Sequence, residues 1–187
     1  EVANICEKVG VDVKEVANAI GLDSRIGPKF LNSGIGFGGS CFPKDVKALI
    51  ATAKFVGVDA KLLKSTMEIN EKQPERAVEF AKETLGNLNG KIIAVLGLAF
   101  KSDTDDMRES RTIPIIKSLI NNGARVRAYD PQAINNAKEI FGNAIEYCST
   151  KEECFENADL CMVLTEWDEF RNMDLSIMKC PLIDGRR

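Results

Sequence analysis

The apolar positions of this chain follow one period up to about residue 88 and a different one beyond it. In the first part they recur every three or four residues, which is the spacing of one face of an α-helix. In the second part, short apolar runs of strand length alternate with helical segments. The pattern therefore predicts an α/β protein with a helical domain at residues 1–88. Residues 89–187 are predicted to form a second domain, a parallel sheet with helices on both faces.

Capping residues and helix breakers divide the first part. The expected helices cover residues 2–9, 12–21 and 46–56, and a further helical run begins at residues 60–70 and ends near residue 86. Asp12 opens the second helix with a capping box, and glycines and prolines remove the helical period between residues 22 and 43. The period resumes after Asp45. Pro74 either kinks the last helix or begins a new one, because proline has no backbone N–H.

Five apolar runs in the second part have the length of β-strands. They cover residues 91–97, 125–129, 145–147, 160–164 and 182–183. Helical patterns lie between them at residues 113–121 and 132–141, and Thr150 opens a third helix with a capping box. Residues 87–90 are expected to join the two domains.

Composition and charge exclude several classes of protein. The net charge is −3 and no run of Lys and Arg is polybasic, so nucleic acid is not an expected partner. No stretch approaches the roughly 20 apolar residues that span a bilayer, so no membrane partner is expected either. Six cysteines without CxxC spacing, and the absence of histidine, argue against a metal site and favour a reducing, cytoplasmic setting.

A glycine-rich segment carries the clearest chemical signal. It reads Gly34-Ile35-Gly36-Phe37-Gly38-Gly39-Ser40-Cys41-Phe42-Pro43-Lys44-Asp45. Glycine lets the backbone approach a ligand closely or adopt a positive φ. Cys41 stands just before a predicted helix, whose N-terminus favours the thiolate that attacks carbonyl carbons. The same spacing also fits a plain helix-entry loop, with Cys41 as a packed thiol and Asp45 as a helix N-terminal charge.

Further motifs run along the whole chain in a fixed order. Besides Gly36 to Asp45, they are Asp23-Ser24-Arg25-Ile26-Gly27-Pro28-Lys29-Phe30-Leu31, Gly97-Leu98-Ala99-Phe100-Lys101 with Asp103-Thr104, Arg108-Glu109-Ser110, Tyr129-Asp130-Pro131, Thr165-Glu166-Trp167 and Asp184-Gly185-Arg186-Arg187. Together they resemble the UDP-glucose 6-dehydrogenases of the UDP-glucose/GDP-mannose dehydrogenase family. The resemblance implies a central helical dimerisation domain with the catalytic cysteine loop, followed by a Rossmann-like UDP-sugar-binding domain.

The family oxidises the C6 alcohol of UDP-glucose to the carboxylate of UDP-glucuronate with two NAD⁺. The resemblance makes Cys41 the nucleophile, which captures the aldehyde as a thiohemiacetal and carries a thioester after the second oxidation. It makes Asp45 the group that assists water activation or proton transfer. A carboxylate one helical turn after the cysteine can face the same site. Lys44 and Arg108 correspond to cofactor-binding residues, although Arg108 also fits a helix-entry salt bridge.

The resemblance also assigns substrate-binding residues. In the first domain these are Arg25, Phe30, Leu31, Asn32, Ser33, Gly34, Ile35, Gly36, Phe37 and Gly38, and in the second Phe100, Lys101 and Arg186. Arg25 is expected to reach the substrate site of a neighbouring subunit in a homodimer built from the central helices, although a solvated arginine fits too. Phe30 and Leu31 also fit ordinary packing. Asn32 stands where many relatives have lysine, which leaves that contact open.

The chain departs from the family pattern in one respect. The GxGxxG loop and the acidic ribose-binding residue of the family's NAD domain do not occur in their expected context. We therefore expect this chain to be the central and C-terminal part of a longer enzyme, without the NAD domain and inactive alone. GDP-mannose or a UDP-N-acetylhexosamine is an alternative substrate, and a non-catalytic nucleotide-sugar-binding or dimerisation module is an alternative function. Ser40 and Phe42 favour UDP-glucose, because the N-acetyl-sugar enzymes carry histidine before the cysteine and the GDP-mannose enzymes leucine after it.

Overall fold

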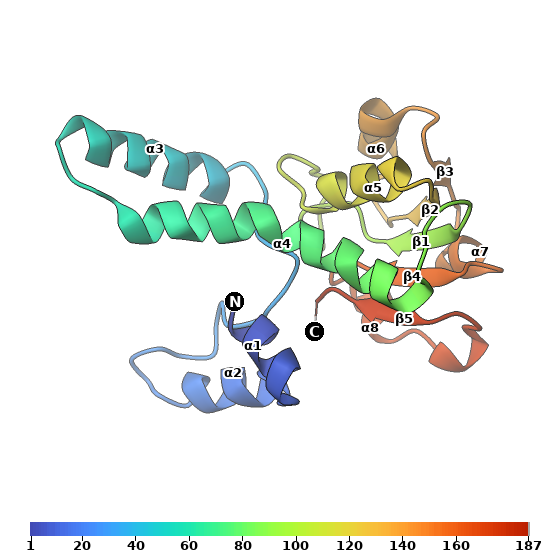
Figure 1. Cartoon of the computed structure of the whole chain (residues 1–187), viewed down its shortest axis with the longest axis horizontal. Coiled ribbons are helices and arrows are strands. Elements are labelled where there is room, and N and C mark those ends of the chain that lie inside the picture. Colours follow the sequence, from blue (N-terminus) through green and yellow to red (C-terminus); the bar gives the residue numbers. More distant parts are fainter. Residues whose placement is uncertain (187) are drawn as a thin grey trace.

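The structure is a computed structural model that describes residues 1–186, and it contains a pair of short helices, a long helical hairpin and a sheet region (Figure 1). The short pair is α1 (Val2–Val9) and α2 (Val13–Gly21), and the hairpin is α3 (Phe42–Phe55) and α4 (Lys61–Leu85). The hairpin projects away from the sheet region, whereas the second half of α4 lies along it (Figure 1). One helix thus connects both parts of the chain. The boundary at residue 88 stays a prediction.

Five strands form a single parallel sheet in the order β3-β2-β1-β4-β5. The strands are β1 (Ile92–Leu96), β2 (Arg125–Tyr129), β3 (Glu146–Tyr147), β4 (Leu160–Val163) and β5 (Leu182–Asp184). The helices between them are α5 (Thr112–Asn121), α6 (Ile134–Phe141), α7 (Lys151–Phe155) and α8 (Asp168–Arg171), and a 3₁₀ helix covers Leu175–Ile177. The predicted α/β class and the parallel sheet are therefore confirmed. Helix α8 and the 3₁₀ helix were not predicted, because they are too short to show a period.

Local capping determines where several helices begin and end. Gly10 closes α1 with a left-handed φ of 71°. The Asp12 carboxylate accepts a hydrogen bond from the N–H of Lys14 at 2.8 Å, which caps α2. Thr150 accepts from the N–H of Glu153, whose carboxylate in turn accepts from the N–H of Ser149. This last pair is a capping box displaced by one residue.

Helix α3 begins earlier than its hydrophobic period predicts. It starts at Phe42 rather than after Asp45, and Cys41 is its N-cap residue. Pro43 lies in the first turn, where a helix needs no N–H donor and the fixed φ of proline is already suitable. Cys41 is therefore attached directly to the helix that the prediction placed several residues away.

Helix α4 runs without interruption from Lys61 to Leu85, so of the two alternatives for Pro74 the structure excludes the start of a new helix. Proline removes one hydrogen bond from a helix interior. Tertiary packing compensates here, because Pro74 is buried and the following turns contribute Ala77, Val78 and Ala81 to the core of the sheet region.

The sheet separates two hydrophobic cores. The larger core joins β1, β2 and β4 to helices α4, α5 and α6, with Ile93, Val95, Ile115, Leu119 and Met162 essentially inaccessible. The smaller core lies on the other face and contains Phe155, Trp167 and Phe170. Burial on both faces explains why β1 and β4 read as continuous apolar runs.

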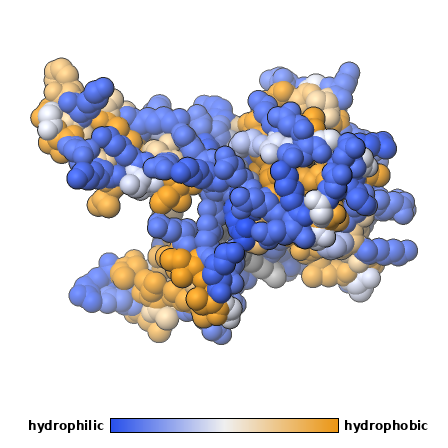
Figure 2. Space-filling view, viewed as in Figure 1, coloured by the Kyte–Doolittle hydropathy of each residue, from blue (hydrophilic) through white to orange (hydrophobic). Residues whose placement is uncertain are grey.

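Apolar side chains remain exposed on the helices outside the sheet region. Figure 2 shows hydrophobic surface on the short helices and toward the end of the helical hairpin. On α3 and the start of α4, Leu49 is 54% exposed, Phe55 90% and Leu62 85%. The apolar face predicted for α3 therefore has no complete partner within the described residues.

Within residues 1–186, no helix combines the length and hydropathy needed to cross a bilayer.

Candidate active site

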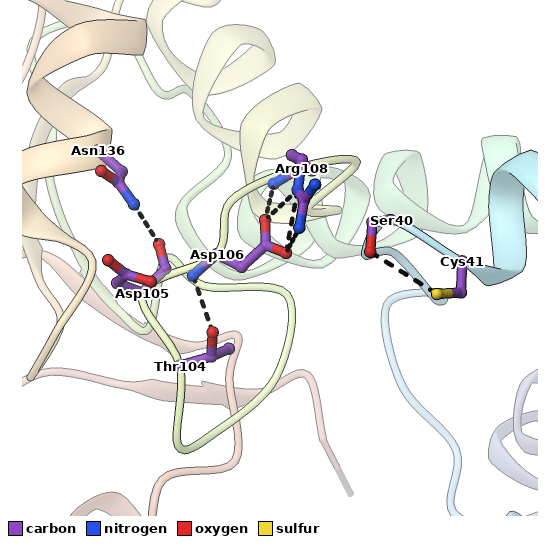
Figure 3. A network of polar contacts seen from close by, with 7 residues as sticks. All are labelled: Ser40, Cys41, Thr104, Asp105, Asp106, Arg108 and Asn136. Carbon is purple, nitrogen blue, oxygen red and sulfur yellow. Dashed lines mark hydrogen bonds and ion pairs between the residues drawn. The ribbon is translucent and has the colours of Figure 1, made fainter.

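Cys41 is the exposed cysteine of the described chain, whereas Cys6, Cys148, Cys154 and Cys161 are buried. Its Sγ lies 3.7 Å from the Oγ of Ser40 (Figure 3). As the N-cap residue of the 14-residue helix α3, it stands at the partially positive end of the helix dipole. A thiol in this position is accessible to a substrate.

The glycine loop, residues 34–40, leads to Cys41 and is held from one side by α4. The Oδ1 atom of Asn70 accepts a hydrogen bond from the N–H of Phe37 at 2.6 Å, and its Nδ2 donates to the Phe37 carbonyl at 3.0 Å. Asn70 is 4% exposed. The sequence reasoning did not identify Asn70, because its partner lies 33 residues away and no local pattern marks it.

The turn after β1 holds the glycine loop from the other side. The N–H of Gly39 donates to the Arg108 carbonyl at 2.8 Å. A Cβ atom on Gly38 would clash with the Glu109 carbonyl, and one on Gly39 would lie 2.7 Å from the Phe100 ring. These glycines are needed because the loop backbone packs directly against the sheet region.

Arg108 lies near Cys41 but is bonded to Asp106. Its Nε and Nη2 donate to the Asp106 carboxylate at 2.8–3.1 Å (Figure 3). This contact holds the pKa of Asp106 below its usual value and raises the pKa of Arg108, to which the nearby Cys41 also contributes. The Arg108 side chain is 70% exposed, so an anionic ligand can reach it. The remainder of this turn is fixed through Asp105, whose carbonyl accepts from Asn136 Nδ2 at 2.7 Å.

Asp45 and Lys44 form an exposed ion pair in the first turn of α3. The Lys44 Nζ lies 2.9 Å from the Asp45 carboxylate, and the side chains are 72% and 63% exposed. The pKa of Lys44 is raised, mainly by Asp45 and to a smaller extent by Cys41. The N–H of Asp45 donates to the Cys41 carbonyl at 2.8 Å, so the two residues lie one helical turn apart. Lys44 and Asp45 therefore lie in the first turn of α3, directly after Cys41.

Asp130 organises the carboxyl edge of the sheet. Its Oδ2 accepts hydrogen bonds from the N–H groups of Leu98 and Ala99 at 2.7 and 3.1 Å, and from Trp167 Nε1 at 3.2 Å. Asp130 is 2% exposed. It links the ends of β1, β2 and β4, which explains the Tyr129-Asp130-Pro131 and Thr165-Glu166-Trp167 motifs. The sequence marked these motifs but did not indicate that they meet.

Arg186 follows β5 and lies against the glycine loop. Its guanidinium is so close to Gly34 that a Cβ atom there would lie 2.5 Å from Nη1. Its Nη2 donates to Glu166 at 3.1 Å, and its buried Nε has no hydrogen-bond partner. Arg186, Glu166 and Asn32 line a cavity of ≈ 320 Å³ whose apolar walls include Trp167. The final residue of the last motif, Arg187, lies outside the described residues.

The remaining predicted substrate-binding residues are distributed around these elements. Phe100 contacts the glycine loop, and Lys101 Nζ lies 5.7 Å from the centroid of its ring. Ile35 is buried in the larger core, so its side chain contributes to packing. Ser33 and Gly34 line a smaller cavity of ≈ 60 Å³ against α4.

Arg25, Phe30 and Leu31 lie on the segment between α2 and the glycine loop. Arg25 is 87% exposed at its side chain and bonds to Asp23 at 2.6 Å. Phe30 is 90% exposed with a φ of 62°, and its ring centroid lies 6.4 Å from that of Phe42. The structure therefore does not bring Arg25 or Phe30 to the cavity beside Arg186 within one chain. Among residues 1–186, no three His, Cys, Asp or Glu side chains are placed to hold a metal ion.

Two family profiles match the chain. The profile described as the UDP binding domain of the UDP-glucose/GDP-mannose dehydrogenase family matches residues 94–187. The profile described as the central domain of the same family matches residues 1–72.

Individual proteins agree with these profiles. UDP-glucose 6-dehydrogenase TuaD of Bacillus subtilis (strain 168) is 48% identical over all of this chain, which spans 41% of its length. A UDP-glucose dehydrogenase from Pyrobaculum islandicum has a TM-score of 0.91 at 37% identity, over 96% of this chain and 41% of that one. The UDP-D-ManNAc dehydrogenase from Pyrococcus horikoshii has a TM-score of 0.83 at 30% identity, over 99% of this chain and 43% of that one.

Proposed function

Because the chain belongs to the UDP-glucose/GDP-mannose dehydrogenase family, we propose that it is the central and C-terminal part of a UDP-glucose 6-dehydrogenase. The whole enzyme would oxidise UDP-glucose to UDP-glucuronate in two NAD-dependent steps. The exposed thiol of Cys41 carries this proposal, since Cys41 is the N-cap residue of α3 and stands beside the carboxyl edge of a parallel sheet, where such sheets bind ligands.

Cys41 is proposed as the nucleophile. Its thiolate attacks the C6 aldehyde formed in the first oxidation, and the resulting thiohemiacetal keeps the aldehyde on the enzyme. Loss of the hydroxyl proton, together with a second hydride from this carbon that NAD⁺ would accept, gives a thioester at Sγ. Water then attacks the thioester carbonyl, the C–S bond breaks, and the thiolate of Cys41 is regenerated with release of the carboxylate.

Asp45 is proposed to transfer protons in the steps that make and break the bond to Cys41. It lies one turn along α3 and is exposed, so its carboxylate can turn from Lys44 toward the thiol when substrate is bound. The N–H groups at the start of α3 would stabilise negative charge on the C6 oxygen.

The residues near Cys41 fit an anionic cofactor. Lys44 and Arg108 are exposed cations, and Cys41 acts electrostatically on both. They would hold the phosphates of NAD⁺, which accepts the hydride in each oxidation when bound.

The nucleotide sugar is proposed to lie between the glycine loop and the carboxyl ends of the strands. Arg186 and Lys101 supply positive charge for the diphosphate there, and Phe100 supplies an apolar surface. The cavity beside Asn32 and Arg186 extends this region. Arg25 is proposed to contribute from a second copy of the chain, which agrees with its exposure.

UDP-glucose is favoured over the other sugars of the family by Ser40 and Phe42, which flank the nucleophile. The higher identity to a UDP-glucose enzyme, 48%, than to the UDP-D-ManNAc enzyme, 30%, supports the same choice.

We also propose a homodimer through α3 and α4, and a cytoplasmic location because free thiols are typical of a reducing compartment.

The test uses the complete enzyme with Cys41→Ala and Cys41→Ser. With UDP-glucose, NADH formation by both variants should fall to a small fraction of the wild-type rate. If the wild-type enzyme also oxidises GDP-mannose or UDP-N-acetylmannosamine slowly, the two variants should lose that activity to the same extent. Cys180→Ala is the matched control, because this half-buried cysteine belongs to the smaller core. Near wild-type turnover in Cys41→Ala would refute the covalent mechanism, and absence of any nucleotide-sugar oxidation by the wild-type enzyme would favour a binding module.

A further inference from the structure

We propose that Asn70 is a positioning residue for Cys41, and this proposal rests on the nucleophilic role proposed for Cys41. Asn70 belongs to α4, and its side-chain amide bonds to Phe37 rather than to the thiol. It acts through the backbone of the glycine loop, whose position determines where α3 begins.

The contact between Asn70 and the loop uses both ends of one side-chain amide. Oδ1 accepts from the N–H of Phe37 at 2.6 Å, and Nδ2 donates to the carbonyl of the same residue at 3.0 Å. This arrangement satisfies both backbone groups of Phe37, as a neighbouring strand would. Because Asn70 is 4% exposed, water cannot easily replace either hydrogen bond.

Gly36, the loop residue next to Phe37, lies close to the Asn70 side chain. Gly36 has a φ of 109°, and a Cβ atom there would lie 2.6 Å from Asn70 Oδ1. The close approach of the Asn70 side chain to the loop backbone therefore requires glycine at position 36. The Arg111 side chain packs against the same glycine, with Cγ 3.1 Å from the position of that Cβ.

A further hydrogen bond, from the sheet region, holds the loop two residues closer to the thiol. The N–H of Gly39 donates to the Arg108 carbonyl at 2.8 Å. The backbone is thus held at Phe37 from α4 and at Gly39 from the sheet region. Only Ser40 separates Gly39 from Cys41, so a shift of the loop is transmitted to the thiol with little chain to absorb it.

Loss of the Asn70 contact is therefore expected to act on the chemical step. A displacement of about 1 Å in a reacting group can lower a rate by about 10²-fold. A residue that only stabilised the fold would lower the amount of active enzyme and leave the kcat of the folded fraction unchanged.

The experiment compares Asn70→Asp and Asn70→Ala with Gln73→Ala in the complete enzyme. Asp has nearly the shape of Asn but sets an oxygen against the Phe37 carbonyl, and Ala removes both hydrogen bonds. Gln73 is the matched control, because its amide lies one turn further along α4 and bonds to Asn4 of α1 rather than to the loop. Amide hydrogen exchange of residues 34–41 is measured by mass spectrometry, together with kcat and KM per folded enzyme.

Both Asn70 variants should show faster exchange in residues 34–41 and a kcat lowered by about 10- to 100-fold, with a smaller change in KM. Gln73→Ala should show neither change. Unaltered exchange of the loop, or faster exchange with a wild-type kcat, would overturn the proposal. If Asn70→Ala does not fold, Asn70→Asp decides the question.

Cys41→Ala is measured beside these variants. If it keeps the wild-type rate, the proposed nucleophile is wrong. If instead Cys41→Ala loses activity while the Asn70 variants keep the wild-type kcat, only the positioning role of Asn70 is refuted.

Discussion

The ring of Phe100 lies against the backbone of Gly39, so closely that a Cβ atom at position 39 would come within 2.7 Å of the ring. One residue follows the first strand of the sheet, and the other stands two positions before Cys41. The contact places the candidate nucleophile beside the carboxyl edge of the sheet, where open parallel sheets bind ligands. It also joins the two halves of the sequence at one site.

We predict that Gly39→Ala disrupts the contact with Phe100 and lowers the turnover of the complete enzyme. Gly39 has a φ of 84°, and a residue with a side chain is strained by about 1–3 kcal/mol in this conformation. The added methyl group would also push the loop away from the Phe100 ring. Turnover of the complete enzyme should fall by at least about 10-fold. Gly57→Ala is the control in kinetic assays, since its φ is 77° but nothing lies within 4 Å of its Cβ position. Equal losses in both variants would mean that backbone strain, rather than the Phe100 contact, accounts for the effect.

Asp130→Ala should destabilise the carboxyl edge of the sheet. It leaves the N–H groups of Leu98 and Ala99 and the indole N–H of Trp167 without their acceptor. Unsatisfied buried donors cost about 1–3 kcal/mol each, so the melting temperature should fall by at least about 4 °C. Differential scanning fluorimetry measures this, with Asp168→Ala as a control because that side chain is 91% exposed. An unchanged melting temperature in Asp130→Ala would contradict the prediction.

The Asp106–Arg108 pair should contribute a small stabilisation that is lost in acid. The Arg108 guanidinium holds the pKa of Asp106 below its usual value in the folded protein. Asp106 therefore stabilises the fold above its unfolded pKa of about 4, and this stabilisation disappears as the pH falls through the lower folded value. The effect is expected to be small because the Arg108 side chain is 70% exposed.

Melting temperatures between about pH 6 and pH 2 test this for Asp106→Asn. The variant should be slightly less stable than wild type at pH 6 and approach it at the acid end. A difference that grows as the pH falls would have the wrong sign.

Leu49→Asp should weaken the proposed homodimer. Leu49 is 54% exposed on α3 and belongs to the apolar face that the described chain does not cover, so a carboxylate there would be buried at an isologous interface. Light scattering at micromolar concentration should show a dimer for the wild-type complete enzyme and monomer for the variant. Lys54→Glu, a charge change elsewhere on α3, should stay dimeric. A monomeric wild type would refute the interface.

The sequence by itself determined those features that depend on neighbouring residues. Gly10, Asp12 and Thr150 mark helix ends because the hydrogen bonds that cap a helix form within a few residues. The strands β1 and β4 were predictable because burial on both faces of a parallel sheet demands continuous apolar runs. The glycine spacing before Cys41 likewise pointed to a backbone in close contact with another group.

Only the tertiary structure decided which distant groups complete the site. The bonds from Asn70 to Phe37, from Trp167 to Asp130 and from Arg186 to Glu166 join residues 33, 37 and 20 positions apart. No period or cap records such pairs, because the path of the intervening chain sets their distance. The same reason explains why Pro74 stays inside α4: its cost is local, whereas the packing of the following helix against the sheet is not.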